Sequence, residues 1–229
     1  AELSEMPTSA RDPRSGRSLT PDQARQLLDV AAQDRLGGLV TVGLMLGLRP
    51  GELCGLRWED VDLDAGVLSV TQSRKRTTDD DGREALVLGA PKTRKSRRAL
   101  VLPRPVVDAL RQHEARQRDE RRNAGERWQD LDLVFPTSVG TPMSPSNLRR
   151  DLARITVAAG LGRWSPNELR HSAASLLSAS GVPLEQIADV LGHTDTRMLL
   201  RHYRHPISRT IDAAAAPMER LFGEPGGER

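Results

Sequence analysis

The amino-acid sequence predicts a mainly helical α+β domain that carries one small antiparallel β-sheet. The chain has 229 residues, which suits one ordinary globular domain. Hydrophobic residues make up 37% and charged residues 28% of it, so an aliphatic core is available and global disorder is not expected. Helical patterns with capping signals occupy most of the sequence, whereas only three short segments have the residues of strands.

The first predicted helix covers residues 20–33, because Thr20-Pro21-Asp22 supplies an N-cap followed by a proline at the first helical position. An apolar run over residues 36–48 follows. It is shorter than the ~20 residues that cross a bilayer, so no membrane span is predicted. Glycines and a proline then interrupt the chain in residues 47–53.

Three strands are predicted at residues 67–71, 85–88 and 98–102. Asp79-Asp80-Asp81-Gly82 supplies a polar turn, and a basic segment precedes the last strand. These strands predict one small antiparallel sheet.

Helices account for most of the remaining chain. Residues 160–166 and the Gly181 and Pro183 pair separate the helical patterns from one another. The predicted helices cover residues 105–123, residues 145–159, a segment that begins near Asn167, and residues 184–191 and 196–203.

Cysteine content and the first residues of the chain predict a cytoplasmic protein. Cys54 is the single cysteine, which excludes an intramolecular disulfide and a multi-cysteine zinc site. Residues 1–16 are polar and charged, without the apolar stretch of a signal peptide.

Positive charge is concentrated in residues 92–122, where eleven Lys or Arg residues face four acidic ones. Such an excess is the electrostatic footprint of a polyanionic partner. A solvated basic helix is the commoner explanation of any single charge run, so this feature alone is weak evidence.

Tyr203, the single tyrosine, lies in a cationic setting. A tyrosine is usually a half-buried packing residue, but two histidines and two arginines flank this one, and His193 comes ten positions earlier. A phenol with a pKa of about 10 becomes a useful nucleophile when cations and hydrogen-bond donors surround it and its target.

Arg49 and Arg170 each lie in an otherwise apolar stretch, where an unpaired guanidinium is costly. A bound anion would remove that cost, because two planar guanidinium groups can clamp one phosphodiester and stabilise a five-coordinate transition state. Glu52 follows Arg49 by three residues, on the same helical face, and is expected to orient it. A simple structural ion pair explains Glu52 equally well.

Lys92 lies in a basic turn between two predicted strands. A hairpin tip can lower a lysine into a DNA groove, where its ammonium can protonate a leaving alkoxide. A solvated basic turn is the alternative. The basic residues around it that are predicted to contact DNA are Arg94, Lys95, Arg97 and Arg98.

No metal or nucleotide cofactor is predicted. Asp60, Asp62 and Asp64 imitate the start of a calcium loop, but glycine comes one place late and Thr71 stands where a bidentate glutamate is needed. The sequence also lacks a glycine-rich phosphate-binding loop.

Taken as a set, four ordered motifs resemble the catalytic domain of tyrosine recombinases, the phage-integrase family. The resemblance implies the DNA breaking-rejoining fold of that family and runs from about Leu19 to His205. The motifs are Gly47-Leu48-Arg49-Pro50-Gly51-Glu52-Leu53, then Pro91-Lys92-Thr93, then Glu168-Leu169-Arg170-His171-Ser172-Ala173-Ala174, then Leu191-Gly192-His193 with Tyr203-Arg204-His205.

The resemblance implies a role for each catalytic residue. Tyr203 would attack the scissile phosphate and form a 3′-phosphotyrosyl link, while Arg49, Arg170 and His193 would hold the non-bridging oxygens. Lys92 would be the general acid, and neither ATP nor metal would be needed. The implied partners are double-stranded DNA, further copies of the chain in a homotetramer, and accessory DNA-bending or directionality proteins, which places the protein at the nucleoid.

Asn167 is a departure from the family pattern, which usually has a histidine three residues before the second arginine. An asparagine can donate a hydrogen bond to phosphate but cannot accept the tyrosyl proton. His171 lies one helical turn further on and is a second acceptor to consider, although a packing role is the commoner reading.

The resemblance also implies a division of the chain into three parts. Residues 1–18 are expected to be a linker from an N-terminal DNA-binding domain, residues 19–205 the catalytic domain, and residues 206–229 a tail that is exchanged between protomers or folds back on its own domain.

Two other functions remain open at this stage. The first is a DNA-binding regulator that uses residues 184–203 as a helix-turn-helix and has no catalysis. The second is a type IB topoisomerase, which shares the chemistry, although the Leu191-Gly192-His193 motif favours a recombinase.

Overall fold

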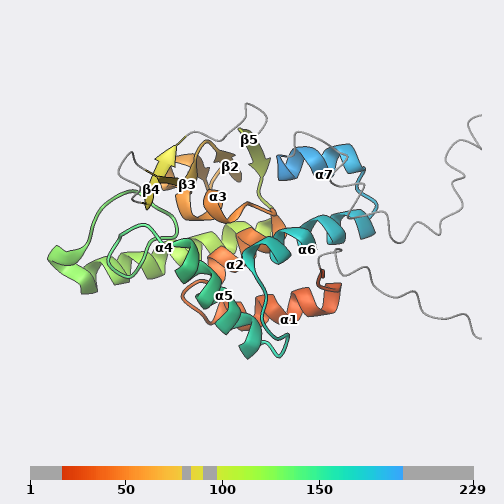
Figure 1. Ribbon diagram of the computed structural model, residues 1–229, viewed down its shortest axis with the longest axis horizontal. Coiled ribbons are helices and arrows are strands. Elements are labelled where there is room, and N and C mark those ends of the chain that lie inside the picture. Colours follow the sequence, from red (N-terminus) through yellow and green to blue (C-terminus); the bar gives the residue numbers. More distant parts are fainter. Residues whose placement is uncertain (1–16, 79–83, 90–96, 193–229) are drawn as a thin grey trace, which may run out of the picture.

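The computed structural model describes residues 17–78, 84–89 and 97–192 (Figure 1). This part of the chain is mainly helical, with short antiparallel strands, as the sequence predicts. The helix predicted at residues 196–203 lies outside the described residues. The helices are α1 (Pro21–Ala32), α2 (Gly37–Met45), α3 (Pro50–Gly55), α4 (Arg104–Ala124), α5 (Pro145–Ala158), α6 (Pro166–Ala179) and α7 (Leu184–Leu191), and the strands are β1 (Val61–Asp62), β2 (Val67–Val70), β3 (Ser73–Thr78), β4 (Glu84–Gly89) and β5 (Arg98–Val101).

Helix α2 is the centre of the core. It is apolar on all sides, and its residues from Gly37 to Leu44 are all buried, as expected of a helix with no polar face. It packs against α1, α3, α4 and α6. The apolar run at residues 36–48 therefore contains the central helix of the core. Within the described residues, no helix is both long and apolar enough to cross a membrane.

Capping side chains define where the helices begin. The Thr20 hydroxyl accepts from the Gln23 backbone N–H at the start of α1, and Ser144 does the same for Asn147 in α5. These bonds satisfy backbone donors that lack a partner within the helix. The starts predicted for α1 and α5 are thereby confirmed.

The strands form two separate units, which corrects the prediction of one sheet. Strands β1, β2 and β5 make a three-stranded antiparallel sheet, in which Val67 faces Val101. Strand β4 pairs instead with β3, with Ser73 opposite Gly89. The first four residues of β3, Ser-Arg-Lys-Arg, are all polar, so the sequence does not predict a strand there, and β4 pairs with a segment outside the three predicted strands.

The elements lie in layers around α2. In Figure 1 the sheet and the β3–β4 hairpin lie above the helices α2 and α4, and α1 and α5 lie below. Helix α7 lies beside β5, with which it is in contact. Two segments far apart in the sequence are thus neighbours at one end of the sheet.

His113 is a buried residue of α4 that belongs to the core. Its ring lies 4.9 Å from that of Phe135 and 6.4 Å from that of Trp58, centroid to centroid, and its Nε2 is 2.6 Å from the Val134 carbonyl oxygen. Burial lowers the pKa of His113, and the hydrogen bond to Val134 only partly opposes that effect. The neutral form is therefore the one that the fold favours.

This burial predicts a pH dependence of stability. The unfolded chain takes up a proton at His113 near pH 6.5, but the folded chain does so only at lower pH. The free energy of unfolding should therefore fall as the pH drops below about 6.5. The free energy of unfolding can be measured in urea at pH 7.5, 6.5 and 5.5. It should fall less with pH in His113→Gln than in the wild type. An equal fall in both would contradict a lowered pKa of His113 in the folded chain.

Candidate active site

The site begins at Arg49, which precedes α3 in an extended conformation. Its backbone N–H donates to Glu52 Oε2 at 2.8 Å, and its Nη1 donates to Glu52 Oε1 at 2.8 Å. The Glu52 side chain is 2% exposed. Glu52 therefore binds both the backbone and the guanidinium of Arg49. It forms an ion pair with Arg49 and at the same time orients its side chain.

Arg98, the first residue of β5, is the second cation on Glu52. Its Nη2 donates to Glu52 Oε2 at 3.0 Å, and its Nη1 lies 3.3 Å from Oε1. Its Nε donates at 2.6 Å to the carbonyl of Val190, at the end of α7. The Arg98 side chain is 8% exposed. Arg98 was predicted to contact DNA, and in the structure its guanidinium makes these contacts within the protein.

Arg170 joins the same place from α6. It is buried, and its guanidinium donates to the Gly47 carbonyl and, at 2.7 Å, to the Leu191 carbonyl. Arg49 Nη2 donates at 2.7 Å to the next carbonyl, that of Gly192. Arg49 and Arg170, which lie far apart in the sequence, therefore bind neighbouring carbonyls. The hydrogen bonds to carbonyl oxygens stabilise the buried guanidinium of Arg170.

Three arginines from three elements therefore hold three successive carbonyls. Arg98, Arg170 and Arg49 bind the oxygens of residues 190, 191 and 192. The last carbonyls of a helix lack partners within it and carry partial negative charge, so cations are favourable there. We call these three arginines, Glu52 and the carbonyls of residues 190–192 the arginine cluster.

Among the described residues of the arginine cluster, guanidinium groups outnumber carboxylates. Its contacts within the described residues include three guanidinium groups and one carboxylate. Burial raises the pKa of Glu52, but the hydrogen bonds and charges of Arg98 and Arg49 outweigh burial, and the pKa lies below its ordinary value. Glu52 is therefore ionised at neutral pH. Arg49 is the most open of the three arginines, with 37% of its side chain exposed.

Asn167, His171 and Arg97 occupy different positions around the cluster. Asn167 is exposed in the first turn of α6, one turn before Arg170. His171 is half-buried on the same helix, and Arg97 is exposed just before β5. The remaining predicted site residues lie outside the described residues, namely Lys92, Arg94, Lys95, His193 and Tyr203.

The carbonyl partners of the cluster are the part that sequence reasoning missed. Gly192 ends α7 in the left-handed conformation, with φ of +64°, which glycine adopts easily at a helix C-terminus. The glycine that follows the predicted helix over residues 184–191 is the one sequence signal for a helix end whose last carbonyls are available to side chains. Nothing in the sequence indicated which side chains would reach them.

Most of the charge run in α4 is neutralised within the protein. Five of its arginines form ion pairs along or beside the helix, as in a solvated basic helix. The charge run in α4 therefore needs no polyanionic partner to explain it. The pairs are Arg104–Asp108, Arg111–Asp64, Arg118–Glu114, Arg121–Asp130 and Arg122–Asp119.

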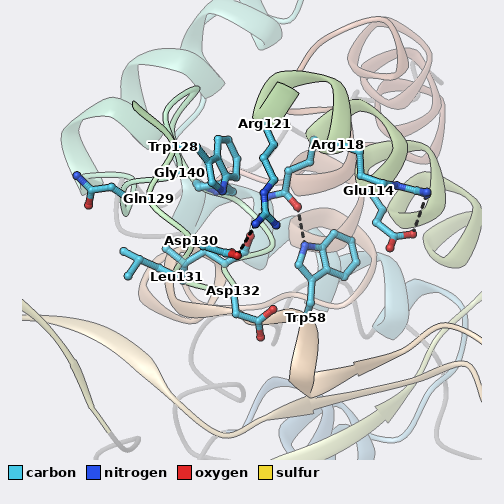
Figure 2. Close-up of a pocket in the computed structure, with 13 residues that line it drawn as sticks. Trp58, Glu114, Arg118, Arg121, Trp128, Gln129, Asp130, Leu131, Asp132 and Gly140 are labelled. Atoms are coloured by element: carbon cyan, nitrogen blue, oxygen red, sulfur yellow. Dashed lines mark hydrogen bonds and ion pairs between the residues drawn. The ribbon is translucent and has the colours of Figure 1, made fainter. Parts of the chain in front are cut away.

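A surface cavity lies elsewhere, between α4 and the segment after it (Figure 2). Trp58 donates its indole N–H to Gln117 at 2.6 Å there, and Arg121 pairs with Asp130 at 2.8 Å. None of the residues of the arginine cluster lines this cavity. In the part of the chain that the structure covers, no group of three or more His, Cys, Asp or Glu residues is arranged to hold a metal ion.

The arrangement of elements matches that of solved integrase and recombinase structures. The fold matches that of the Tn1549 transposon integrase, solved in complex with transposon right end DNA, with a TM-score of 0.71 and 23% identity over 92% of this chain and 67% of that one. It also matches the XerA recombinase, with a TM-score of 0.64 and 22% identity over 96% of this chain and 68% of that one.

Sequence comparison gives the family. The model of the phage integrase family matches residues 17–209, so the chain belongs to this family. An integrase of Streptomyces ambofaciens is 36% identical over 221 residues, covering 91% of this chain and 54% of the relative. A XerC-like tyrosine recombinase of Caldanaerobacter subterraneus subsp. tengcongensis is 29% identical over 212 residues, covering 90% and 54%. The chain spans about half the length of these curated relatives.

Alanine variants of Gly47 and Gly66 test how closely α7 packs against residues 47–49, which lead into α3. Both glycines have positive φ, +62° and +65°, but a Cβ at Gly47 would lie 2.4 Å from Leu191 Cδ2 and 3.2 Å from Ala173 Cβ, whereas one at Gly66 meets nothing within 4 Å. Backbone strain is common to both alanine variants, and overpacking adds about 1–3 kcal/mol at Gly47 alone. Urea unfolding should therefore show that Gly47→Ala is the less stable variant by that margin, and equal stabilities would contradict the packing.

Proposed function

We propose that residues 19–205 are the catalytic domain of a site-specific DNA recombinase, which breaks and rejoins DNA through a covalent 3′-phosphotyrosyl intermediate. The arginine cluster is the observation that supports this most directly. It brings two buried arginines and the half-exposed Arg49 to one place. Family membership and the ordered motifs supply the reaction class.

The arginines would supply electrostatic stabilisation. A five-coordinate phosphorane carries more negative charge on its non-bridging oxygens than the starting diester does. Guanidinium groups already fixed in place meet this charge without reorganising, and their planar forks match phosphate oxygens. Glu52 and the helix carbonyls provide that fixation for Arg49 and Arg170.

The covalent step is assigned to residues of the family motifs. The Tyr203 oxygen attacks the scissile phosphorus, a 3′-phosphotyrosyl ester forms, and the bond from phosphorus to the 5′ oxygen breaks. The leaving oxygen takes a proton from Lys92, the tyrosyl proton passes to an acceptor near Asn167, and His193 holds a non-bridging oxygen. A free 5′-hydroxyl reverses the step and rejoins the strands, so the ester energy is conserved without ATP or metal.

Double-stranded DNA is the proposed partner, at the nucleoid, with Arg97, Arg94 and Lys95 contacting its backbone. Phosphate contacts of this kind make binding depend on salt. We assign residues 1–18 to a linker from an N-terminal DNA-binding domain and residues 206–229 to a tail exchanged within a homotetramer on DNA. Accessory DNA-bending or directionality proteins would set the direction of recombination.

Tyr203→Phe tests the nucleophile. The chain is incubated in EDTA with nicked duplexes carrying a randomised site, and adducts are resolved by denaturing electrophoresis. The wild type should form an adduct and Tyr203→Phe none, while its DNA binding stays within a few-fold, because one hydroxyl adds little to a contact made by phosphate neutralisation. An adduct in Tyr203→Phe would overturn the assignment. Binding by the wild type without any adduct would favour a regulator that only binds DNA.

Asn167 is the feature that favours a regulator that binds DNA without cleaving it. Its amide is exposed at the first turn of α6 and cannot accept a proton. If the chain is an enzyme, Asn167→His should keep or raise the single-turnover cleavage rate near pH 7. A histidine with a pKa of about 6.5 accepts the proton there, and general-base help is typically worth ~10²–10⁴-fold.

The pH dependence of cleavage by wild type, Asn167→His and His171→Ala decides how the proton leaves. An Asn167→His variant that folds and binds DNA but does not cleave it would contradict the missing-base account. Loss of cleavage in His171→Ala alone would make His171 the acceptor.

A further inference from the structure

The bonds of Arg98 close a ring that includes Arg49. Arg98 binds Glu52, Glu52 binds Arg49, and Arg49 binds the Gly192 carbonyl. The chain runs back from Gly192 to Val190, whose carbonyl accepts from Arg98 Nε at 2.6 Å. The ring therefore ties β5, α3 and the end of α7 together, and each bond restricts where the Arg49 guanidinium can lie.

Arg98 is placed to support Arg49 and not to touch a ligand. Its side chain is 8% exposed, against 37% for Arg49. Its Nε and its two Nη atoms point to partners on different elements, which suits the rigid fork of a guanidinium and not the single ammonium of lysine. Gly192 makes room for it, since a Cβ there would lie 2.8 Å from Arg98 Nη1.

Charge gives Arg98 a second effect on Arg49. Glu52 is shared by the two arginines, so neither holds the full carboxylate. Without Arg98, both oxygens of a buried carboxylate are left to Arg49 alone. Arg49 would then be more fully neutralised and a weaker partner for a phosphate oxygen.

We propose that Arg98 is a positioning residue for Arg49, which it holds through Glu52 and through the end of α7, so that Arg49 can meet the charge on a scissile phosphate. This inference rests on the proposed function. Arg98 acts through other residues, and its loss should impair the chemical step more than DNA binding.

The test compares Arg98→Met and Arg98→Lys with Arg104→Met, which removes the same charge from a side chain 91% exposed in the first turn of α4. Single-turnover cleavage is measured at saturating DNA, on a nicked duplex whose scissile phosphate has been located from wild-type adducts. Arg98→Met should cleave at least tenfold more slowly, with DNA affinity within threefold of the wild type. Arg98→Lys should be intermediate, and Arg104→Met should cleave like the wild type.

A neutral substrate separates positioning from general damage to the fold. When a methylphosphonate replaces the scissile phosphate, one non-bridging oxygen and its charge are gone, so a fault in Arg49 matters less. The defect of Arg98→Met should shrink on this substrate. An equal defect on both substrates, or cleavage of the natural substrate at the wild-type rate, would overturn the proposal.

Amide hydrogen exchange gives a readout that does not depend on activity. Exchange in residues 188–192 should be faster in Arg98→Met than in the wild type or Arg104→Met, because a bond to the end of α7 is lost. Unchanged exchange there would overturn the role of Arg98 even if the wild type forms no adduct. The two outcomes can also differ. If the wild type forms no adduct but Arg98→Met exchanges faster in residues 188–192, the proposed function is overturned and the ring of bonds is still supported.

Discussion

The buried carboxylate of Glu52 is the interaction on which the candidate site depends. A carboxylate that is 2% exposed is costly unless it is paired and hydrogen-bonded, and Glu52 meets this condition with Arg49, Arg98 and the Arg49 backbone N–H. Satisfying one acid therefore fixes two arginines from different elements. The third arginine, Arg170, is held by backbone carbonyls.

The position of α7 depends on the same contacts. Its apolar residues, Ile187, Ala188 and Leu191, form a small cluster with Ala174 that is separate from the main core. Leu177, Val182 and Leu184 pack against this small cluster, and Val190 of α7 packs against the main core. The three arginines that bind the carbonyls of residues 190–192 supply polar attachments in addition, so the helix end and the arginines position each other.

Local signals explain which elements the sequence could predict. The N-caps at Thr20 and Ser144 mark helix starts through bonds between residues three apart, so sequence spacing alone reveals them. Strand pairing is not local in this way. Strand β3 lacks aliphatic residues, and the partner of β4 could not be identified without it. The charge run of α4 was similarly ambiguous, because one of its partners, Asp64, is distant in sequence.

The α+β class, the starts of α1 and α5, and the family could be predicted from the sequence, because capping, periodicity and ordered motifs are patterns along the chain. It also pointed to Arg49, Glu52 and Arg170 as candidate site residues. Only the tertiary structure decided that Arg98 is buried on Glu52 and that the end of α7 receives three guanidinium groups. These contacts join α3, β5, α6 and α7. Apart from Glu52, the acceptors are backbone carbonyls, which every residue carries, so the sequence does not show which side chains reach them.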